Sequence, residues 1–298
     1  MFGKKNTIRI IIRVCSASNN LGLRAFKFPN QKTMIFECLN SLFKGCSKVK
    51  ERVKITIVDD SGAEEFRKEL KSLLEKYELN GEVAGINLRS NSGSIVYCLD
   101  LFNKSNEDLF FLCEDDYLFT ENAIQFILDA YDEKIIGTDQ FALFPPDYLY
   151  AYEKLFQSYV FIDKNCHWRS IIQTTGTFVM TKQIFKENKE TLYDFARTAV
   201  DFKLMKLWEK IPTISPIPSI ACHLNYDTIS PHVNWQSVMT KHYPINNHPK
   251  ERINKDILLK KVKRKIKWFY GNILHKPFYR SAQNNHLDAF KRIIKNYK

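Results

Sequence analysis

Short apolar runs and longer amphipathic segments alternate over the first 130 residues of the chain. The runs are rich in β-branched and aromatic residues and lie at positions 7–14, 53–62, 85–88 and 108–119. In the other segments apolar residues recur every three or four positions, at 33–43, 63–79, 94–102 and 120–133, where Thr120 is the expected N-cap of the last helix. Since such runs predict strands and such segments predict helices, the order indicates an α/β fold with a mainly parallel central sheet flanked by helices.

The second half of the chain is less regular. A strand, a turn and a helix are predicted at 174–188, and a helix at 199–210. The proline-spaced segment 211–226 is expected to be extended.

The chain divides by charge into a body, residues 1–249, and a tail, residues 250–298. The body holds 30 Lys/Arg and 30 Asp/Glu, whereas the tail holds 15 and 3, so the tail carries the whole formal charge of +12. This asymmetry points to a partner of the tail rather than to the fold. We expect the body to be one domain with the halves 1–130 and 131–249.

Several classes of protein are excluded by composition. No apolar run approaches the ~20 residues that span a bilayer. The N-terminal apolar run is short and is broken by Arg9 and Arg13, so no signal peptide is predicted and we expect a cytoplasmic protein. Seven cysteines are scattered without any Cys-x-x-Cys, which predicts reduced thiols and no zinc site made of thiolates.

Polar stretches follow three of the predicted strands: "CSASNN", "DDSG" and "CEDDY". Ligands of open parallel sheets bind outside the carboxyl ends of the strands, and these three ends would meet at one edge. The carboxylates gathered there are Asp59, Asp60, Glu114, Asp115 and Asp116. They would repel one another unless a cation or hydrogen-bond donors offset them, and the residue types suit Mg²⁺ or Mn²⁺. The alternative is that each acidic stretch is only a solvated turn.

The first half resembles the family 2 glycosyltransferases, which have the GT-A fold. The similarity rests on "VKITIVDDSG", "LRSNSGSIVYCLDLF" and "LFFLCEDDYLF", which are like the family's Asp-Asp-Gly-Ser strand end, its Asn-x-Gly helix start and its Asp-x-Asp strand end. It covers residues 7–130 well and 170–225 loosely. It implies a GT-A-like fold and transfer of a sugar from a nucleoside-diphosphate sugar.

The resemblance also implies roles for individual residues. A nucleotide would be bound by Ser16, Ala17, Asp59, Asp60, Arg89, Asn91, Glu114 and Asp115. Asp116 would be the metal ligand that bridges to the diphosphate, and His223 a further ligand, although a lone histidine is more often structural. Glu114 stands where the family's motif has its first Asp, which leaves the ribose contact open.

A general base is implied in the second half. Asp201 matches the second acid of a pair that opens a helix in the family, but Val200 stands in place of the first. A base there would take the proton of an acceptor hydroxyl, and a single displacement would invert the anomeric carbon. Asp194 is the fallback, and the bland alternative is that Asp201 is a helix-face acid.

The tail reads as a basic amphipathic helix. Apolar residues recur from Leu258 to Ile273 among many lysines, and Trp268, Phe269 and Tyr270 lie at its end. This pattern suits an anionic membrane surface on the inner face of a membrane, where an enzyme would meet lipid-linked acceptors. The alternatives are that the stripe packs on the body or that the charge binds nucleic acid, for which no recognised module is present.

The expected activity is transfer of one sugar to a hydroxyl of a glycan or lipid-linked glycan, as in polysaccharide biosynthesis. The glutamine/arginine-x-x-Arg-Trp signature of polymerising synthases does not occur in the chain. Two alternatives stay open: a nucleotidyltransferase, although no Gly-rich phosphate loop is found, and a non-catalytic GT-A-like scaffold at a membrane.

Overall fold

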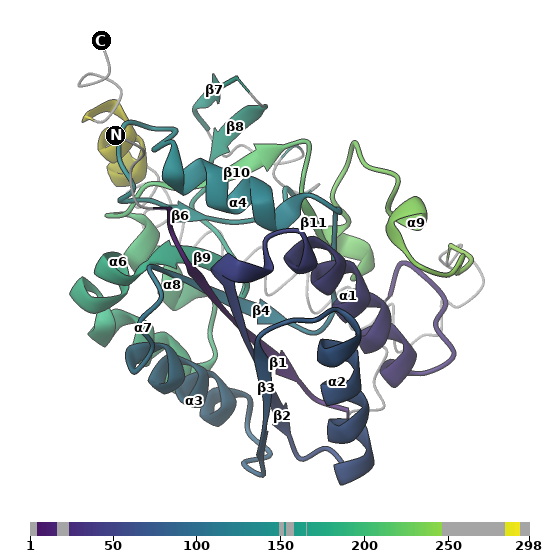
Figure 1. The fold of residues 1–298 in the computed structure, drawn as a ribbon. Helices are drawn as coiled ribbons and strands as arrows, with labels where there is room; N and C mark the ends of the chain where they lie inside the picture. Colours follow the sequence, from purple (N-terminus) through teal and green to yellow (C-terminus); the bar gives the residue numbers. More distant parts are fainter. Residues whose placement is uncertain are drawn as a thin grey trace, which may run out of the picture.

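A computed structural model describes residues 5–16, 24–148, 152, 158–164, 166–245 and 284–292. Its centre is a nine-stranded sheet in the order β3-β2-β1-β4-β9-β6-β10-β8-β7, and β11 pairs with β5 in a second, two-stranded sheet (Figure 1). The strands are β1 Ile8–Val14, β2 Val53–Asp60, β3 Gly81–Ile86, β4 Leu109–Glu114, β5 Tyr117–Phe119, β6 Ala142–Leu143, β7 Val160–Ile162, β8 His167–Ser170, β9 Phe178–Thr181, β10 Thr213–Ile217 and β11 Ala221–His223.

Helices cover both faces of the large sheet (Figure 1). They are α1 Gln31–Ser47, α2 Glu64–Lys76, α3 Asn91–Asn103, α4 Ala123–Asp132, α6 Lys182–Glu187, α7 Lys189–Thr198, α8 Phe202–Trp208 and α9 Trp235–Val238. Alternating residues of β1 serve the two faces: Ile10 and Ile12 join the apolar cluster under α1 and α4, while Ile11 joins the cluster under α3 and α7. A strand buried on both sides must be largely apolar, and β1 is apolar except for Arg9 and Arg13, which both have hydrogen-bond partners.

The first four strands, β1 to β4, are parallel, as the sequence predicts. Ile10 lies between Ile55 of β2 and Phe111 of β4, and β2 pairs in turn with β3. Antiparallel neighbours enter only in the second half, where β9 inserts between β4 and β6. The predicted fold class, α/β with a mainly parallel central sheet flanked by helices, is confirmed.

The acidic segment after β4 turns sharply out of the large sheet. β4 ends at Glu114, and β5 begins at Tyr117 and pairs with β11, so that Tyr117 faces His223 across the two strands. The prediction of one continuous strand over 108–119 was therefore wrong. This break brings His223, more than a hundred residues away in sequence, to the acidic strand end.

Three element boundaries also differ from the sequence prediction. The third strand is Gly81–Ile86 rather than 85–88, and its first residue packs closely on Ile55, where a Cβ on Gly81 would lie 3.2 Å from the Ile55 carbonyl. Helix α3 begins at Asn91 rather than residue 94, because the Ser90 side chain caps it by accepting from the Gly93 N–H. The N-cap of α4 is Asn122, not Thr120.

The described part of the tail, residues 284–292, is a helix that packs on the body. Phe290 is buried against Tyr159, and His286 Nδ1 lies 2.9 Å from the Trp208 carbonyl oxygen. The predicted amphipathic stripe from Leu258 to Ile273 lies outside the described residues. Within the described part of the chain, no helix combines the length and apolarity needed to cross a bilayer.

Candidate functional site

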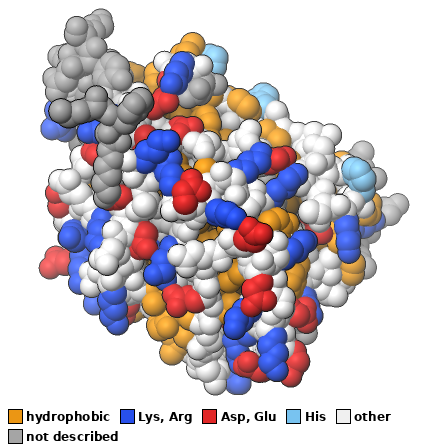
Figure 2. All heavy atoms as spheres, in the orientation of Figure 1, with side chains coloured by type: hydrophobic (Ala, Val, Ile, Leu, Met, Phe, Trp, Pro, Cys, Tyr) orange, Lys and Arg blue, Asp and Glu red, His pale blue; other side chains and the backbone are white. Residues whose placement is uncertain are grey.

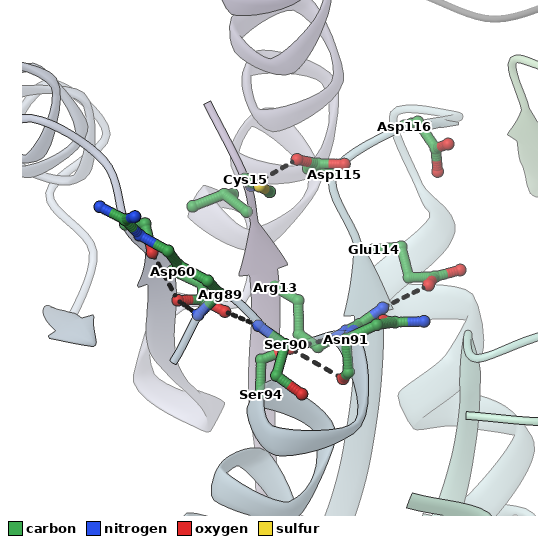
Figure 3. A pocket seen from close by; sticks show the side chains of 12 residues that line it. Arg13, Cys15, Asp60, Arg89, Ser90, Asn91, Ser94, Glu114, Asp115 and Asp116 are labelled. Carbon is green, nitrogen blue, oxygen red and sulfur yellow. Dashed lines mark hydrogen bonds and ion pairs between the residues drawn. The ribbon is translucent and has the colours of Figure 1, made fainter. Parts of the chain in front are cut away.

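A cavity of about 500 Å³ opens at the carboxyl ends of β1, β2 and β4 (Figure 3). The topology predicts a ligand site at this edge, since three parallel strands end there side by side. The cavity is lined by Arg13, Val14, Cys15, Asp60, Ser61, Arg89, Ser90, Asn91, Ser94, Glu114, Asp115 and Asp116.

Asp60 holds the loop between β3 and α3. Its Oδ1 accepts the N–H groups of Leu88 (2.8 Å) and Arg89 (2.9 Å), and its Oδ2 accepts that of Ser90 (3.1 Å). Arg89 has a left-handed backbone with φ 47°, which these bonds stabilise. Burial alone would raise the pKa of Asp60, but the N–H donors outweigh it and lower that pKa.

Asp59 does not share this position, although the sequence placed it in the site. Its carboxylate is fully buried under Gly62 and ion-pairs with Arg67 of α2 at 3.2 Å. Burial raises its pKa against the opposing effect of Arg67. The side chains of adjacent strand residues point to opposite faces, so only one of the two aspartates can turn toward the cavity.

Arg13 links three walls of the cavity. Its Nη2 donates to Glu114 Oε1 at 2.7 Å, while its Nη1 donates to the Asn91 carbonyl oxygen at 3.1 Å and to Ser94 Oγ at 3.0 Å. The Asn91 side-chain oxygen accepts from the same nitrogen. The guanidinium thus offsets one carboxylate of the cluster and fixes the start of α3 against the end of β4.

Asp115, the residue after Glu114, lies against the residue that follows β1. Its Oδ2 accepts the backbone N–H of Cys15 at 3.0 Å. Burial and the neighbouring charge of Asp116 raise the pKa of Asp115 to about 7. The acidic cluster is therefore not uniformly charged near neutral pH, which reduces its self-repulsion.

Asp116 is compensated by two cationic side chains. Its Oδ2 lies 2.7 Å from Arg24 Nη1 and 3.0 Å from His223 Nε2. Burial would raise its pKa, but the charges of His223 and Arg24 prevail and hold that pKa well below the ordinary range. The pKa of His223 is raised in return, because Asp116 outweighs the effect of burial.

The His223 ring is fixed from two sides. Thr228 Oγ1 lies 2.9 Å from His223 Nδ1, so Nε2 is the nitrogen that faces Asp116. The ring also stacks on Tyr117, with centroids 4.8 Å apart and planes 10° apart. Metal-binding histidines in proteins are commonly held by a partner on the second ring nitrogen in this way.

A divalent cation would enter this site in place of the ion pair between Asp116 and His223, because an imidazole binds a metal only after the coordinating nitrogen loses its proton. Asp116 Oδ1 is buried and has no hydrogen-bond partner, and it lies on the same carboxylate that meets His223 Nε2. No group of three or more His, Cys, Asp or Glu side chains in the described residues is arranged as a metal cage. Among the described residues the side chains that meet at this point are therefore two, Asp116 and His223.

Asp201 is the N-cap residue of α8 and does not line the cavity; the residue as a whole is exposed, but its carboxyl group is crowded by the surrounding protein. It makes no side-chain capping bond to the helix. Loss of hydration and the charge of Glu114 raise its pKa to about 6, against the opposing effects of Arg13 and His223. The charge of Glu114 thus acts on Asp201, whose pKa is that of a weak base.

The other predicted residues are less informative. Ser16 is described but does not line the cavity, and Ala17 lies outside the described residues. Asp194 is exposed and ion-paired with Lys203 at 2.6 Å, and this pair lowers its pKa. Its charge is already satisfied, so it is a poorer candidate base than Asp201.

Sequence reasoning missed Arg13, Arg24, Ser94 and Thr228. Arg13 could have been found, because an arginine near the end of an otherwise apolar buried strand must have a partner. Arg24 and Thr228 carry no local signal, since their positions depend on contacts between distant segments.

No protein-family model matches the chain, and no curated protein sequence is similar to it. Similar solved structures include S. aureus TarS (14% identity, 78% of this chain and 38% of that chain, TM-score 0.46), which is also solved in complex with UDP. They also include the Pyrobaculum calidifontis mannosyltransferase PcManGT with GDP-Man and Mn²⁺ (9% identity, 62% of this chain and 47% of that chain, TM-score 0.40). A third is GalNAc-T7 with UDP, GalNAc and Mn²⁺ (10% identity, 74% of this chain and 43% of that chain, TM-score 0.49). The chain spans less than half the length of these three proteins.

Proposed function

We propose that the protein is a metal-dependent glycosyltransferase that moves a sugar from a nucleoside-diphosphate sugar to a hydroxyl group. One observation carries the proposal: Asp116, with a buried oxygen that lacks a partner, meets an oriented His223 beside a cavity at the carboxyl edge of the sheet. A pocket of about 500 Å³ is large enough for a nucleotide.

The cavity offers two chemically different ends for such a donor. The loop held by Asp60 and the start of α3 present hydroxyl and amide groups, from Ser90 and Asn91, that suit a ribose and base. The opposite end presents Asp116, whose carboxylate meets His223, and a diphosphate would complete a metal site there. The donor would therefore lie across the strand ends, with its sugar directed toward the second half.

Asp116 and His223 would hold Mn²⁺ or Mg²⁺. When bound, the cation neutralises the negative charge that develops on the nucleoside diphosphate as the glycosidic bond breaks. Arg24, which lies 2.7 Å from Asp116 Oδ2, would add positive charge on the same side. Thr228 and Tyr117 would keep the imidazole in place for this task.

Asp201 would be the general base. Its carboxylate would take the proton of the acceptor hydroxyl as the oxygen attacks the anomeric carbon, and one displacement would invert that carbon. A pKa of about 6 suits this role, since the group is mostly ionised at neutral pH yet is basic enough to accept a proton.

The acceptor would be a glycan or a lipid-linked glycan, modified by one sugar at a time. The positively charged tail favours work at an anionic membrane surface over work in bulk solution. The protein would then act in the cytoplasm as a peripheral enzyme on the inner face of a membrane.

The direct test is thermal melting of the full chain with nucleoside diphosphates, UDP and GDP first, with and without Mn²⁺. We expect the melting temperature to rise when both are added, and the rise to be absent in Asp116→Ala. Asp139→Ala, which removes a half-exposed carboxylate outside the cavity, is the matched control and should keep the rise.

A screen of nucleotide sugars for hydrolysis or transfer should then identify the donor. Stabilisation without any turnover by any donor would leave a nucleotide-binding scaffold. No stabilisation by any nucleotide, with or without metal, would refute the proposal.

A further inference from the structure

The C-terminal helix, residues 284–292, packs on the body through one face and is drawn in yellow in Figure 1. His286, Leu287 and Phe290 on that face are buried, and His286 is only 1% exposed. On the face of the molecule that Figure 2 shows, the basic and acidic side chains of the described residues are interspersed and form no patch of one sign. The described contacts of this helix are therefore best understood from its partner within the chain.

His286 caps the carboxyl end of α8. Trp208 is the last residue of that helix, and the residue four positions on, Pro212, has no N–H to donate to the Trp208 carbonyl. His286 Nδ1 lies 2.9 Å from this carbonyl oxygen, so Nδ1 carries the proton and donates it. Among the described residues, Nε2 is buried without a partner, and burial lowers the pKa of His286 to about 4, so the ring is neutral at pH 7.

The histidine therefore adds a directed bond at the cost of an unpartnered buried nitrogen. An apolar side chain of similar size would fill the same space without that cost. The property that only the polar side chain supplies at this position is the hydrogen bond to α8.

The side chain of Trp208 makes a second directed bond, on the side of the acidic strand end. Its Nε1 donates to Thr174 Oγ1 at 2.8 Å, and both residues are buried. Thr174 opens the loop 174–177, and the Glu114 N–H donates to Thr177 Oγ1 at 3.2 Å. Trp208 thus connects the C-terminal helix to the loop that holds Glu114.

The helix α8 needs such constraints because it is short. It has seven residues, whereas an isolated helix is marginal in water below about 12–15 residues. Leu204 and Leu207 are buried in the apolar cluster, but apolar contact is non-directional and does not by itself fix the position of the helix along its axis. Asp201 is the N-cap at the other end, about 10 Å from Trp208 at the usual rise of an α-helix.

We propose that the C-terminal helix is a positioning element of the second half, in which the bond from His286 to Trp208 fixes α8 and so places Asp201 relative to Glu114. His286 is a positioning residue, since it acts through Trp208 and does not line the cavity. The consequence for transfer rests on the proposed function, because it takes Asp201 as the base. Nucleotide binding should not depend on this helix, since the residues that line the cavity all lie between positions 13 and 116.

The first test is hydrogen exchange of the full chain, followed by mass spectrometry. His286→Leu removes the donor, and His286→Asn keeps an N–H near the position of Nδ1. We expect amides of α8 and of the loop 174–177 to exchange about tenfold faster in His286→Leu, while β1 and β2 are unchanged. His286→Asn should exchange nearly as the wild type does, and so should Asp288→Asn, which changes an exposed residue of the same helix.

The second test is turnover of UDP- and GDP-sugars with Mn²⁺, measured as release of the nucleoside diphosphate. We expect kcat to fall about 10- to 100-fold in His286→Leu, because the base is misplaced, while KM for the donor and the rise in melting temperature with nucleotide and Mn²⁺ stay unchanged. His286→Asn should restore kcat to within a few-fold of the wild type.

The outcomes separate positioning from a merely structural role. Exchange in α8 that is unchanged in His286→Leu, or that rises equally in β1 and β2, would overturn the proposal. A loosened α8 with an unchanged kcat would overturn it too, and His286→Asn behaving like His286→Leu would show that the hydrogen bond is not the constraint. If no nucleotide stabilises any of these proteins, the proposed function is refuted, and the exchange result still decides whether the C-terminal helix fixes α8.

Discussion

Tyr117 and His223 lie face to face across the small sheet, with ring centroids 4.8 Å apart. The Tyr117 hydroxyl is itself anchored, 2.6 Å from Thr175 Oγ1 and 2.7 Å from the Tyr148 hydroxyl. Tyr117 therefore fixes the plane of the imidazole, and Thr228 fixes its rotation within that plane. His223 is presented to Asp116 in one orientation, which is the condition for a metal ligand of defined geometry.

Removal of the Thr228 hydroxyl should weaken metal binding without unfolding the protein. Thr228→Val keeps the shape of the side chain but frees His223 Nδ1, so Nε2 is no longer held toward Asp116. We expect the affinity for Mn²⁺ in the presence of a nucleoside diphosphate to fall about 10- to 100-fold. The measurement is the free Mn²⁺ signal in electron paramagnetic resonance during a titration.

Thr228→Ser retains the hydroxyl and is the matched control, so its Mn²⁺ affinity should stay within a few-fold of the wild type. If Thr228→Ser binds as weakly as Thr228→Val, packing of the methyl group and not the hydrogen bond controls the site. If both bind like the wild type, His223 is not a ligand.

Asp201→Asn should abolish transfer, and the pH profile of the wild type should contain one ionisation that belongs to Asp201. Because the base must be deprotonated, kcat/KM of the wild type should rise with pH and level off above about pH 6, the pKa of Asp201. Asp194→Asn is the control: its carboxylate is paired with Lys203, so the profile should be unchanged. A wild-type profile that is flat from pH 5 to 8 would contradict the role of Asp201.

Although Asp201→Asn should abolish transfer, it should not destabilise the folded protein at neutral pH. The folded protein raises the pKa of Asp201, so it binds a proton there more tightly than the unfolded chain does. The ionised carboxylate thus destabilises the fold above about pH 6, and Asp201→Asn should melt at an equal or higher temperature than the wild type at pH 7.5. That advantage should vanish below about pH 4, where both states of the wild type are protonated.

The sequence predicted the first half of the fold well because each element there has a local cause. The strands β1 and β2 bury apolar side chains on both faces of the sheet, and α2 has one apolar stripe with Phe66, Leu70 and Leu74 buried. The acidic cluster at the strand ends was also predictable, since parallel strands end at a common edge. Its members are Asp60, Glu114, Asp115 and Asp116, which all line the cavity.

The features that the sequence did not predict depend on contacts between segments far apart in the chain. The break after Glu114 depends on pairing between β5 and β11. The segment "CEDDYLF" contains no local signal for a partner strand a hundred residues away. Which aspartate of the "DD" pair faces the cavity is set by strand register, since a shift of one residue reverses the two sides. The environment of Arg24 depends on the same return of the chain.

Asp60→Asn should destabilise the protein, because Asp60 is a structural anchor as well as a wall of the cavity. The asparagine side chain keeps one acceptor oxygen, but its NH₂ group replaces the Asp60 Oδ2 that now accepts the Ser90 N–H. Two hydrogen-bond donors would then face each other. We expect a loss of about 1–3 kcal/mol in the free energy of unfolding, measured by urea at pH 7. Ser61→Ala, which removes one donor to the same carboxylate, should cost less.

The sign of the pH dependence follows from the lowered pKa of Asp60. Its stabilisation is present above the ordinary aspartate pKa and is lost as the pH falls through the folded-state pKa. The difference between wild type and Asp60→Asn should therefore shrink below about pH 4. A difference that stays constant from pH 7 to pH 3 would show that the charge of Asp60 is not what holds the loop.

Gly62→Ala should be strongly destabilising, and the cause should be Asp59. A Cβ at position 62 would lie 2.2 Å from Asp59 Oδ2 and 2.3 Å from Oδ1, and the buried carboxylate is held in place by Arg67. We expect Gly62→Ala to cost about 1–3 kcal/mol in the free energy of unfolding.

The test is a double-mutant cycle: in an Asp59→Ala background the clash is gone, and Gly62→Ala should cost at least about 1 kcal/mol less than in the wild type. Gly45→Ala in α1 is the control, because its nearest neighbour is 3.4 Å away and alanine favours the helix by up to about 1 kcal/mol. Additive effects of Asp59→Ala and Gly62→Ala would mean that Asp59 does not lie over the glycine, and the separation of the two aspartates into a buried anchor and a cavity residue would be wrong.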